Sequence, residues 1–265
     1  MTITTAPPAR TAFRVRGFGT LLRTEARVWL RGVSTVFFSL AFPTVLLVGV
    51  GFAIPGMRDV IEDVGPQWDG LTAFAAYVPV ILAVAIATPA LTTMPVWFAS
   101  FRERGVLRRL STTPMRPQGI IAAHLIITVA AIVVAAVIAL LAGQLTIGVW
   151  RPAHPWTVVL VFLLGVAALC SLGLLVASRA SKGSVASGIG SLVYFPMLFF
   201  AGVWTPGPIM PHAVAAIARF TPLGATAQAM TSGWFESGFP TLCVLVLVAW
   251  TAVLLPLSVR LFRWS

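Results

Sequence analysis

The chain has 265 residues, of which 58% are hydrophobic and only 9% are charged, and its mean hydropathy is +0.97. A soluble domain carries roughly 25% charged residues, so these values exclude an ordinary water-soluble protein and indicate about six membrane spans of ~20 residues each. The net charge of +11 would suggest nucleic-acid binding in a soluble protein, but we attribute it to membrane topology and expect no nucleic-acid partner.

The N-terminal part, residues 1–31, is predicted to be cytoplasmic, and residues 32–265 are predicted to form a six-helix transmembrane domain. Between residues 14 and 31 the spacing predicts an amphipathic helix, because a step of 100° per residue places basic side chains such as Arg23 and Arg27 on one face and apolar side chains on the other. Such a helix can lie on the membrane surface and contact lipid headgroups through its arginines.

Glu25 is the exception in this helix, because it falls in the middle of the apolar face. Two interpretations stand at this point. Its carboxylate either turns toward water near the interface, or it pairs with a basic residue of the next cytoplasmic loop and anchors the helix there.

Six runs without charge follow along the chain. No Asp, Glu, Lys or Arg occurs in Gly32–Met57, Gly70–Phe101, Pro117–Trp150, Pro152–Ser178, Gly183–Ala218 or Ser237–Val259. Each run can cross ~30 Å of hydrocarbon as a helix, and none shows the alternation of a transmembrane β-strand. We therefore predict an all-α polytopic membrane protein.

The second run contains three prolines, Pro79, Pro89 and Pro95. Prolines are tolerated in a spanning helix when neighbours or nearby threonines satisfy the freed carbonyls. The resulting kinks are expected either to line or flex a transport path or to serve packing alone.

A docking element is predicted directly after the second run, at residues 101–114. Its charges surround apolar residues that share one side, which is the pattern of a protein interface with an apolar centre and a charged rim. The candidate contact residues are Arg102, Glu103, Arg104, Gly105, Leu107, Arg109 and Leu110.

The fifth run is too long for one span, and prolines in its second half break a helix. We predict one span over about residues 183–204 and then a short re-entrant or interfacial segment to about Met230. The marker residues of this segment are Gly202, Pro206, Pro211 and Pro222. Small residues near the start of the span would let another helix approach closely, either from the same chain or across a dimer interface.

Six spans with a cytoplasmic N-terminus leave only Arg58, Arg151 and Arg219 of the 18 basic residues outside. The positive-inside rule therefore predicts that both termini are cytoplasmic. Because the chain uses arginine almost to the exclusion of lysine, we expect a GC-rich genome and a prokaryotic inner membrane.

Two stretches carry a resemblance to a known family. The residues Glu103, Gly105, Leu107, Leu110, Thr113 and Pro114 resemble the loop that follows the second span in ABC-2 type transporter permeases. Residues 195–206, together with Pro211 and residues 220–223, resemble the end of the fifth span and the re-entrant element of that family. Val106 and Arg108 depart from the family pattern.

The resemblance implies a permease that pairs with a second permease, identical or homologous, above two copies of an ABC ATPase. The loop at Glu103 would be the coupling helix and residues 14–31 the connecting helix. ATP and Mg would be held by the ATPase, and this chain would bind no cofactor. It implies export of a hydrophobic or amphipathic compound, such as a drug, antibiotic or lipid-like molecule.

The sequence fits a permease without its own ATPase, because it contains no G-x-x-x-x-G-K-[ST] motif for binding phosphates. Its three histidines, His124, His154 and His212, are scattered and have no metal-ligand spacing, so we predict no catalytic, cofactor or metal residues. The alternatives are a membrane assembly protein without transport activity and an ion-coupled secondary transporter. The latter normally needs an ionisable residue inside the membrane, and the six runs offer only His124, near an end.

Overall fold

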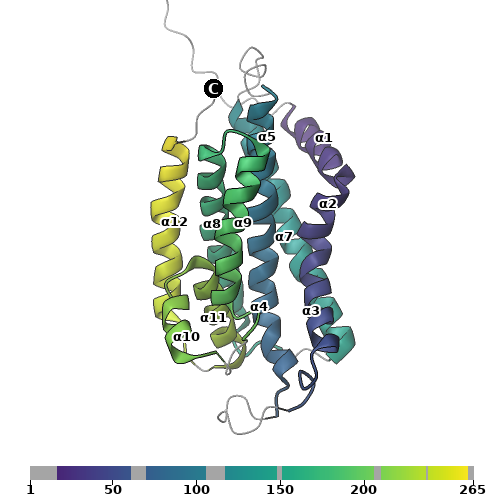
Figure 1. The fold of residues 1–265 in the computed structure, drawn as a ribbon, viewed down its shortest axis with the longest axis vertical. Helices are drawn as coiled ribbons and strands as arrows, with labels where there is room; N and C mark the ends of the chain where they lie inside the picture. The colour runs from purple at the N-terminus through teal and green to yellow at the C-terminus, as the bar shows by residue number, and fades with distance from the viewer. Residues whose placement is uncertain are drawn as a thin grey trace, which may run out of the picture.

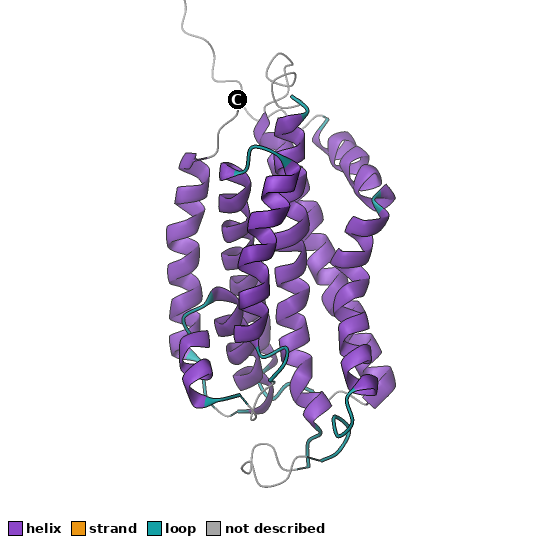
Figure 2. Ribbon diagram, viewed as in Figure 1, coloured by secondary structure: helices purple, strands orange, loops and turns teal. Residues whose placement is uncertain are grey.

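The structure, a computed structural model, describes residues 17–60, 70–105, 117–147, 151–205, 210–236 and 238–261. Within these ranges the chain is helical apart from short connections, and the long helices run along one common axis (Figures 1 and 2). Six helices of the described chain are long and apolar enough to cross a membrane. Their bounds are Val33–Ala53, Ala73–Glu103, Gly119–Thr146, Pro155–Arg179, Gly183–Ala201 and Thr241–Leu261. The prediction of an all-α fold with six spans is therefore confirmed.

Several spans are built from more than one helical element. The first span consists of α2 (Val33–Val36), the π-helix η1 (Phe37–Ala41) and α3 (Phe42–Ala53), and it follows α1 (Phe18–Arg31). The second span consists of α4 (Ala73–Thr88), the π-helix η2 (Pro89–Thr93) and α5 (Met94–Glu103). The remaining helices are α7 (Pro117–Ile147), α8 (Pro155–Arg179), α9 (Gly183–Ala201), α10 (His212–Ala218), α11 (Pro222–Phe235) and α12 (Thr241–Leu261).

The irregularity of the second span lies where the sequence has prolines. Pro89 begins η2, and Pro95 is the second residue of α5. Local π-helical geometry is one way in which a spanning helix accommodates such prolines. The side chains of Thr92 and Thr93 each donate a hydrogen bond to a carbonyl one turn earlier, at 2.6 Å to Thr88 O and 3.1 Å to Pro89 O. These bonds give both hydroxyls a partner within their own helix.

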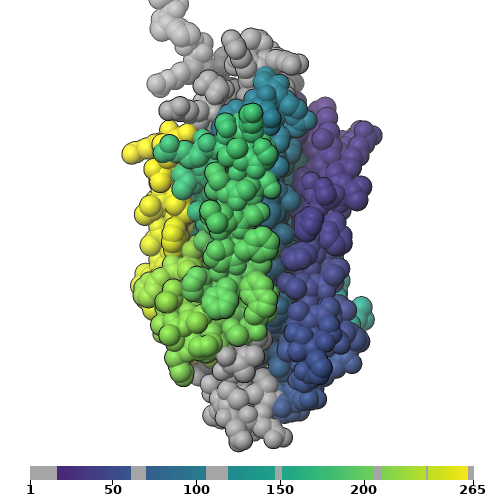
Figure 3. All heavy atoms as spheres, in the orientation of Figure 1, coloured from purple at the N-terminus to yellow at the C-terminus, as the bar shows by residue number. Residues whose placement is uncertain are grey.

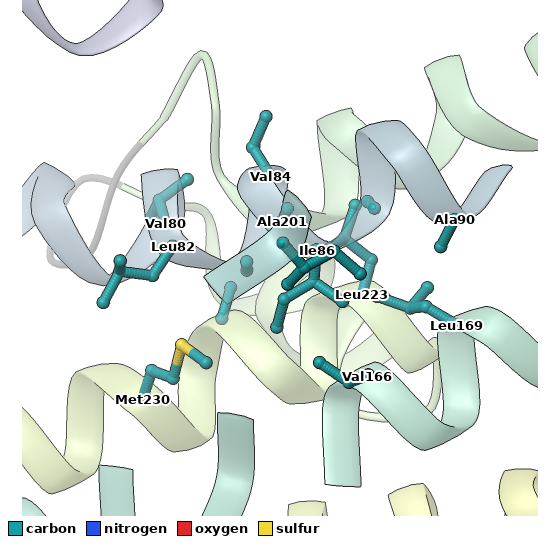
Figure 4. Packing of buried hydrophobic residues seen from close by; sticks show 14 of the residues in the cluster. Val80, Leu82, Val84, Ile86, Ala90, Val166, Leu169, Ala201, Leu223 and Met230 are labelled. Atoms are coloured by element: carbon teal, nitrogen blue, oxygen red, sulfur yellow. The ribbon is translucent and has the colours of Figure 1, made fainter. Parts of the chain in front are cut away.

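The second span is the central helix of the bundle, because its membrane-spanning window is entirely buried inside the protein. It packs against α3, α7, α8, α9 and α11. Figure 4 shows aliphatic side chains of α4, such as Ile86, meeting Leu223 of α11 and Val166 and Leu169 of α8. Since lipid is as apolar as these side chains, close packing rather than exclusion from water holds the helices together.

The segment between α9 and α12 contains two short helices. Pro222 does not interrupt α11 but begins it, since proline is favoured at the first helical position, and the Thr221 hydroxyl caps it by accepting a hydrogen bond from Gly224 N at 3.1 Å. α11 extends to Phe235 rather than ending near Met230, and it is buried against α4, α8, α9 and α12. That this segment is re-entrant in the bilayer stays a prediction.

The two ends of the bundle differ in the elements that they carry. α1, the end of α5 and the end of α12 lie at one end, whereas α10 and the end of α3 lie at the other (Figure 1). With the six spans of the described chain, α1 and the end of α12 must lie at the same end of the bundle. We call that end the α1 end.

Candidate functional site

The second span ends at the residues that the sequence analysis assigned to a docking element. Gly105 has a φ of +65°, a left-handed conformation that favours glycine, and its N–H donates to Arg102 O at 2.9 Å. The helix therefore stops at Glu103. Because of this turn, the last charged side chains of α5 project at the α1 end of the bundle beside the α8–α9 connection.

Arg102 binds the carboxyl end of α8. Its Nη1 donates hydrogen bonds to Ala177 O at 3.0 Å and to Ala180 O at 2.7 Å. The last carbonyls of a helix have no partner within the helix, and a cation is favoured there because it faces the negative end of the helix dipole. The guanidinium thus caps the carboxyl end of the fourth span.

Glu103 binds the amino end of the next helix. Its Oε2 accepts a hydrogen bond at 3.1 Å from the N–H of Gly183, the first residue of α9. The preceding residue, Lys182, offers no side-chain cap. A carboxylate at a helix N-terminus is favoured by the helix dipole and makes a strong, charge-assisted bond to the amide. Neighbouring residues of opposite charge therefore hold the two ends of one helix–helix connection.

The other predicted coupling residues have varied surroundings. Arg104 donates from Nε to Ser100 O at 3.2 Å, and its guanidinium lies 5.5 Å from the centre of the Phe101 ring, which is within the range of a cation–π interaction. The predicted contact residues Leu107, Arg109 and Leu110 lie outside the described residues. Contact of this region with an ATPase stays a prediction.

The predicted segment after the fifth span is described in part. Gly202 ends α9 in a left-handed conformation with a φ of +86°, and Pro211 is the residue before α10. Pro222 begins α11, whereas Pro206 lies outside the described residues.

α1 packs against the start of the third span. Arg23 and Arg27 are exposed, and Trp29 is buried against Ile127 and Ala131 of α7. That α1 is an amphipathic helix on the membrane surface stays a prediction.

Glu25 is half-buried in this packing. Its Oε2 has no hydrogen-bond partner in the described part of the chain. Burial removes water from the carboxylate and raises the pKa of Glu25 above its ordinary value. Both interpretations of Glu25 stay predictions, because Arg108, Arg109 and Arg116 of the next loop lie outside the described residues.

A groove opens between the first span, the second span and α9. Its volume is about 670 Å³. Aromatic rings such as Trp97 and Phe195 line it together with hydroxyls such as Ser187. Arg104 also lines it, and no Asp or Glu does among the described residues. In Figure 3 the residues of the second span show at mid-height as a narrow strip between α9 and the first span. A groove with rings and hydroxyls can hold an amphipathic molecule.

His124 is a candidate functional residue that was not predicted from the sequence. It is 2% exposed and lines the groove, with its ring stacked on that of Trp97 at 3.7 Å between centroids. A single histidine in an apolar run gives no sequence signal for this position. In the described chain, no group of three or more His, Cys, Asp or Glu side chains is placed to bind a metal ion.

The small residues of α9 divide between two environments. Gly190 lies so close to Leu91 O of the second span that a Cβ there would overlap it, whereas Gly188 has open space. Ser184 and Ser187 are exposed on the surface of the described chain. Contact within the chain, one of the two alternatives left open by the sequence, accounts for Gly183, where a Cβ would overlap the Ser100 hydroxyl; that the exposed residues face another subunit stays a prediction.

A family model described as ABC-2 type transporter matches residues 16–235. This match covers most of the chain and includes every described element from α1 to α11. No curated protein matches the chain.

Proposed function

Because the chain belongs to the ABC-2 type transporter family, we propose that it is the permease subunit of an exporter that uses ATP hydrolysed by a separate polypeptide. The observation that carries this proposal is the family match over a six-span bundle without a phosphate-binding motif. Two ATPase subunits, which bind ATP and Mg, would contact the α1 end. There the charged residues Arg102, Glu103 and Arg104 end a fully buried span.

The groove supports the proposed substrate class. A hydrophobic or amphipathic compound, such as a drug, an antibiotic or a lipid-like molecule, can place flat apolar surface against Trp97 and Phe195 and polar groups near Ser187. A second permease, identical or homologous, would complete the path by packing on the exposed small residues of α9, since small residues let helices approach closely in lipid.

The distribution of charge supports the proposed orientation. Most described basic residues lie at the α1 end, including Arg23, Arg27, Arg179 and Arg260, and by the positive-inside rule this end faces the cytoplasm. We propose that the chain is a multi-pass protein of a prokaryotic inner membrane with both termini cytoplasmic.

The test is purification of the tagged full chain from its native membranes. We expect an ATPase subunit to co-purify, and we expect ATP hydrolysis by the complex to fall when Glu103→Ala and Leu107→Ala are combined. Arg151→Gln, a charge removal at the opposite end, serves as the control and should leave hydrolysis unchanged. Absence of an ATPase would contradict the proposal. Flux driven by an ion gradient without ATP would instead support a secondary transporter, and no flux at all would support an assembly protein.

A further inference from the structure

The second span is joined to α8 and α9 by close contacts at several levels along their length. Beside the α1 end, a Cβ on Gly183 would overlap the Ser100 hydroxyl of α5. Deeper in the bundle, Gly190 of α9 meets Leu91 O, and Gly173 of α8 meets Ala90 O, without room for a Cβ at either glycine. These contacts involve backbone atoms of η2, which cannot relieve a displacement by changing rotamer. The second span therefore packs directly against α8 and against α9 at these levels.

The first span has other principal partners than α9. α3 and η1 pack against α7 and α4, and α1 packs against α7. The principal partners of α9 are α5, η2 and α11. The groove lies between the first span and α9, beside the second span. A displacement of α9 with the second span therefore changes the width of the groove.

Hydrogen bonds from two charged side chains connect the end of α5 to α8 and α9, so a force on the end of α5 would act on both helices through them. Arg102 holds Ala177 O and Ala180 O at the end of α8, and Glu103 holds Gly183 N at the start of α9. Each bond is charge-assisted and therefore stronger than a bond between neutral groups. Removal of one such bond changes an equilibrium by roughly tenfold to hundredfold.

We propose that Arg102 and Glu103 are positioning residues that transmit a displacement of the end of α5 to α8 and α9, and thereby to the groove. This inference rests on the proposed function, because the ATPase supplies the displacement. It assigns the two side chains a task inside the permease: Glu103 moves the fifth span and Arg102 moves the fourth.

The experiment measures amide hydrogen exchange of the purified permease–ATPase complex in nanodiscs, with and without ATP and vanadate. In the unmodified complex we expect ATP to change exchange in the peptides that cover 98–105, 155–179 and 183–201. In Glu103→Ala the change in 183–201 falls roughly tenfold or more, while the change in 98–105 remains. In Arg102→Ala the change in 155–179 falls instead. Glu236→Ala, an acid removal at the opposite end, is the control and should match the unmodified complex.

A covalent tether separates transmission from a general loss of structure. The Cβ of Ser100 lies 3.6 Å from the Cβ position at Gly183, which is within the ~3.5–4.5 Å of a disulfide. Ser100→Cys with Gly183→Cys, added to Glu103→Ala in a background of Cys170→Ala and Cys243→Ala, should restore the response of 183–201 when oxidised and lose it when reduced.

The outcomes are distinct. An unchanged response of 183–201 in Glu103→Ala, or no restoration by the oxidised tether, would overturn the inference. The absence of any ATP-dependent change in the unmodified complex would instead overturn the proposed function on which the inference depends.

Discussion

Gly188 and Gly190 of α9 offer a matched pair for testing the close contact with the second span. They lie two residues apart in one helix, and replacement by alanine adds the same intrinsic helix preference of about 0.5–1 kcal/mol at both positions. Only at Gly190 would the new methyl group overlap a neighbour, the backbone oxygen of Leu91. α9 and the second span would have to separate by roughly 1 Å to restore an ordinary contact.

The size of the effect follows from this geometry. Overpacking of a well-packed interior costs about 1–3 kcal/mol, and the upper part of that range is expected because a backbone oxygen cannot rotate away. Gly190→Ala should therefore be less stable than Gly188→Ala by about 2–3 kcal/mol. This corresponds to a difference of roughly 4–12 °C in the unfolding midpoint.

The assay is thermal unfolding of the purified chain in nanodiscs, followed by tryptophan fluorescence at one fixed scan rate, since midpoints of irreversible unfolding depend on that rate. Gly49→Ala in α3, where a Cβ also meets open space, is a second control on another helix. Equal midpoints for Gly190→Ala and both controls would show that the second span and α9 are not in backbone contact, and the reasoning would be refuted.

Three further predictions concern single side chains. Burial raises the pKa of Glu25 above 4.5, so the docked α1 loses stability as the pH rises above that value. Glu25→Gln should therefore slow proteolysis within α1 at pH 7.5, and the difference from the unmodified chain should vanish toward pH 4.5. An equal effect at both pH values would contradict this prediction. The hydroxyls of Thr88 and Tyr194 lie 2.7 Å apart. A double-mutant cycle with Thr88→Val and Tyr194→Phe, measured by chemical unfolding, should therefore give a coupling free energy of about 0.6–1.7 kcal/mol. Additive effects of the two substitutions would argue against the bond. Trp250 donates a hydrogen bond from Nε1 to Phe220 O at 2.9 Å. Trp250→Phe should therefore lower the free energy of unfolding by about 1 kcal/mol and speed amide exchange in residues 221–225. Unchanged exchange in these residues would mean that the bond does not hold α11.

The number and position of the spans could be predicted from the sequence because both depend on one quantity, the length of chain without charge. Hydrocarbon excludes unpaired charge, so each uncharged run ends close to where a helix leaves the membrane. The second span illustrates the limit of this rule, since it continues past Phe101 to Glu103. Arg102 and Glu103 can extend the helix because the ends of α8 and α9 supply their partners.

The roles of individual residues were harder to predict because they depend on neighbours far away in the chain. A charge in a loop was interpreted as a contact for another protein, yet Glu103 has a partner eighty residues later. Pro222 was interpreted as part of a broken segment, but proline both ends and begins helices, and only the hydroxyl of Thr221 in front of it signals a beginning. His124 shows the same limit, since the groove that it lines is assembled from α1 and three spans other than its own.

The burial of the second span has a consequence for biogenesis. Its partners α8, α9 and α11 are all synthesised after it, so the faces of the central helix that they cover remain in contact with lipid until most of the chain has left the ribosome. A core element of a soluble protein would aggregate if it were exposed before its partners were made, but a uniformly apolar helix is stable among acyl chains. The last step of assembly is then the exchange of lipid for protein around a helix that was among the first to be inserted.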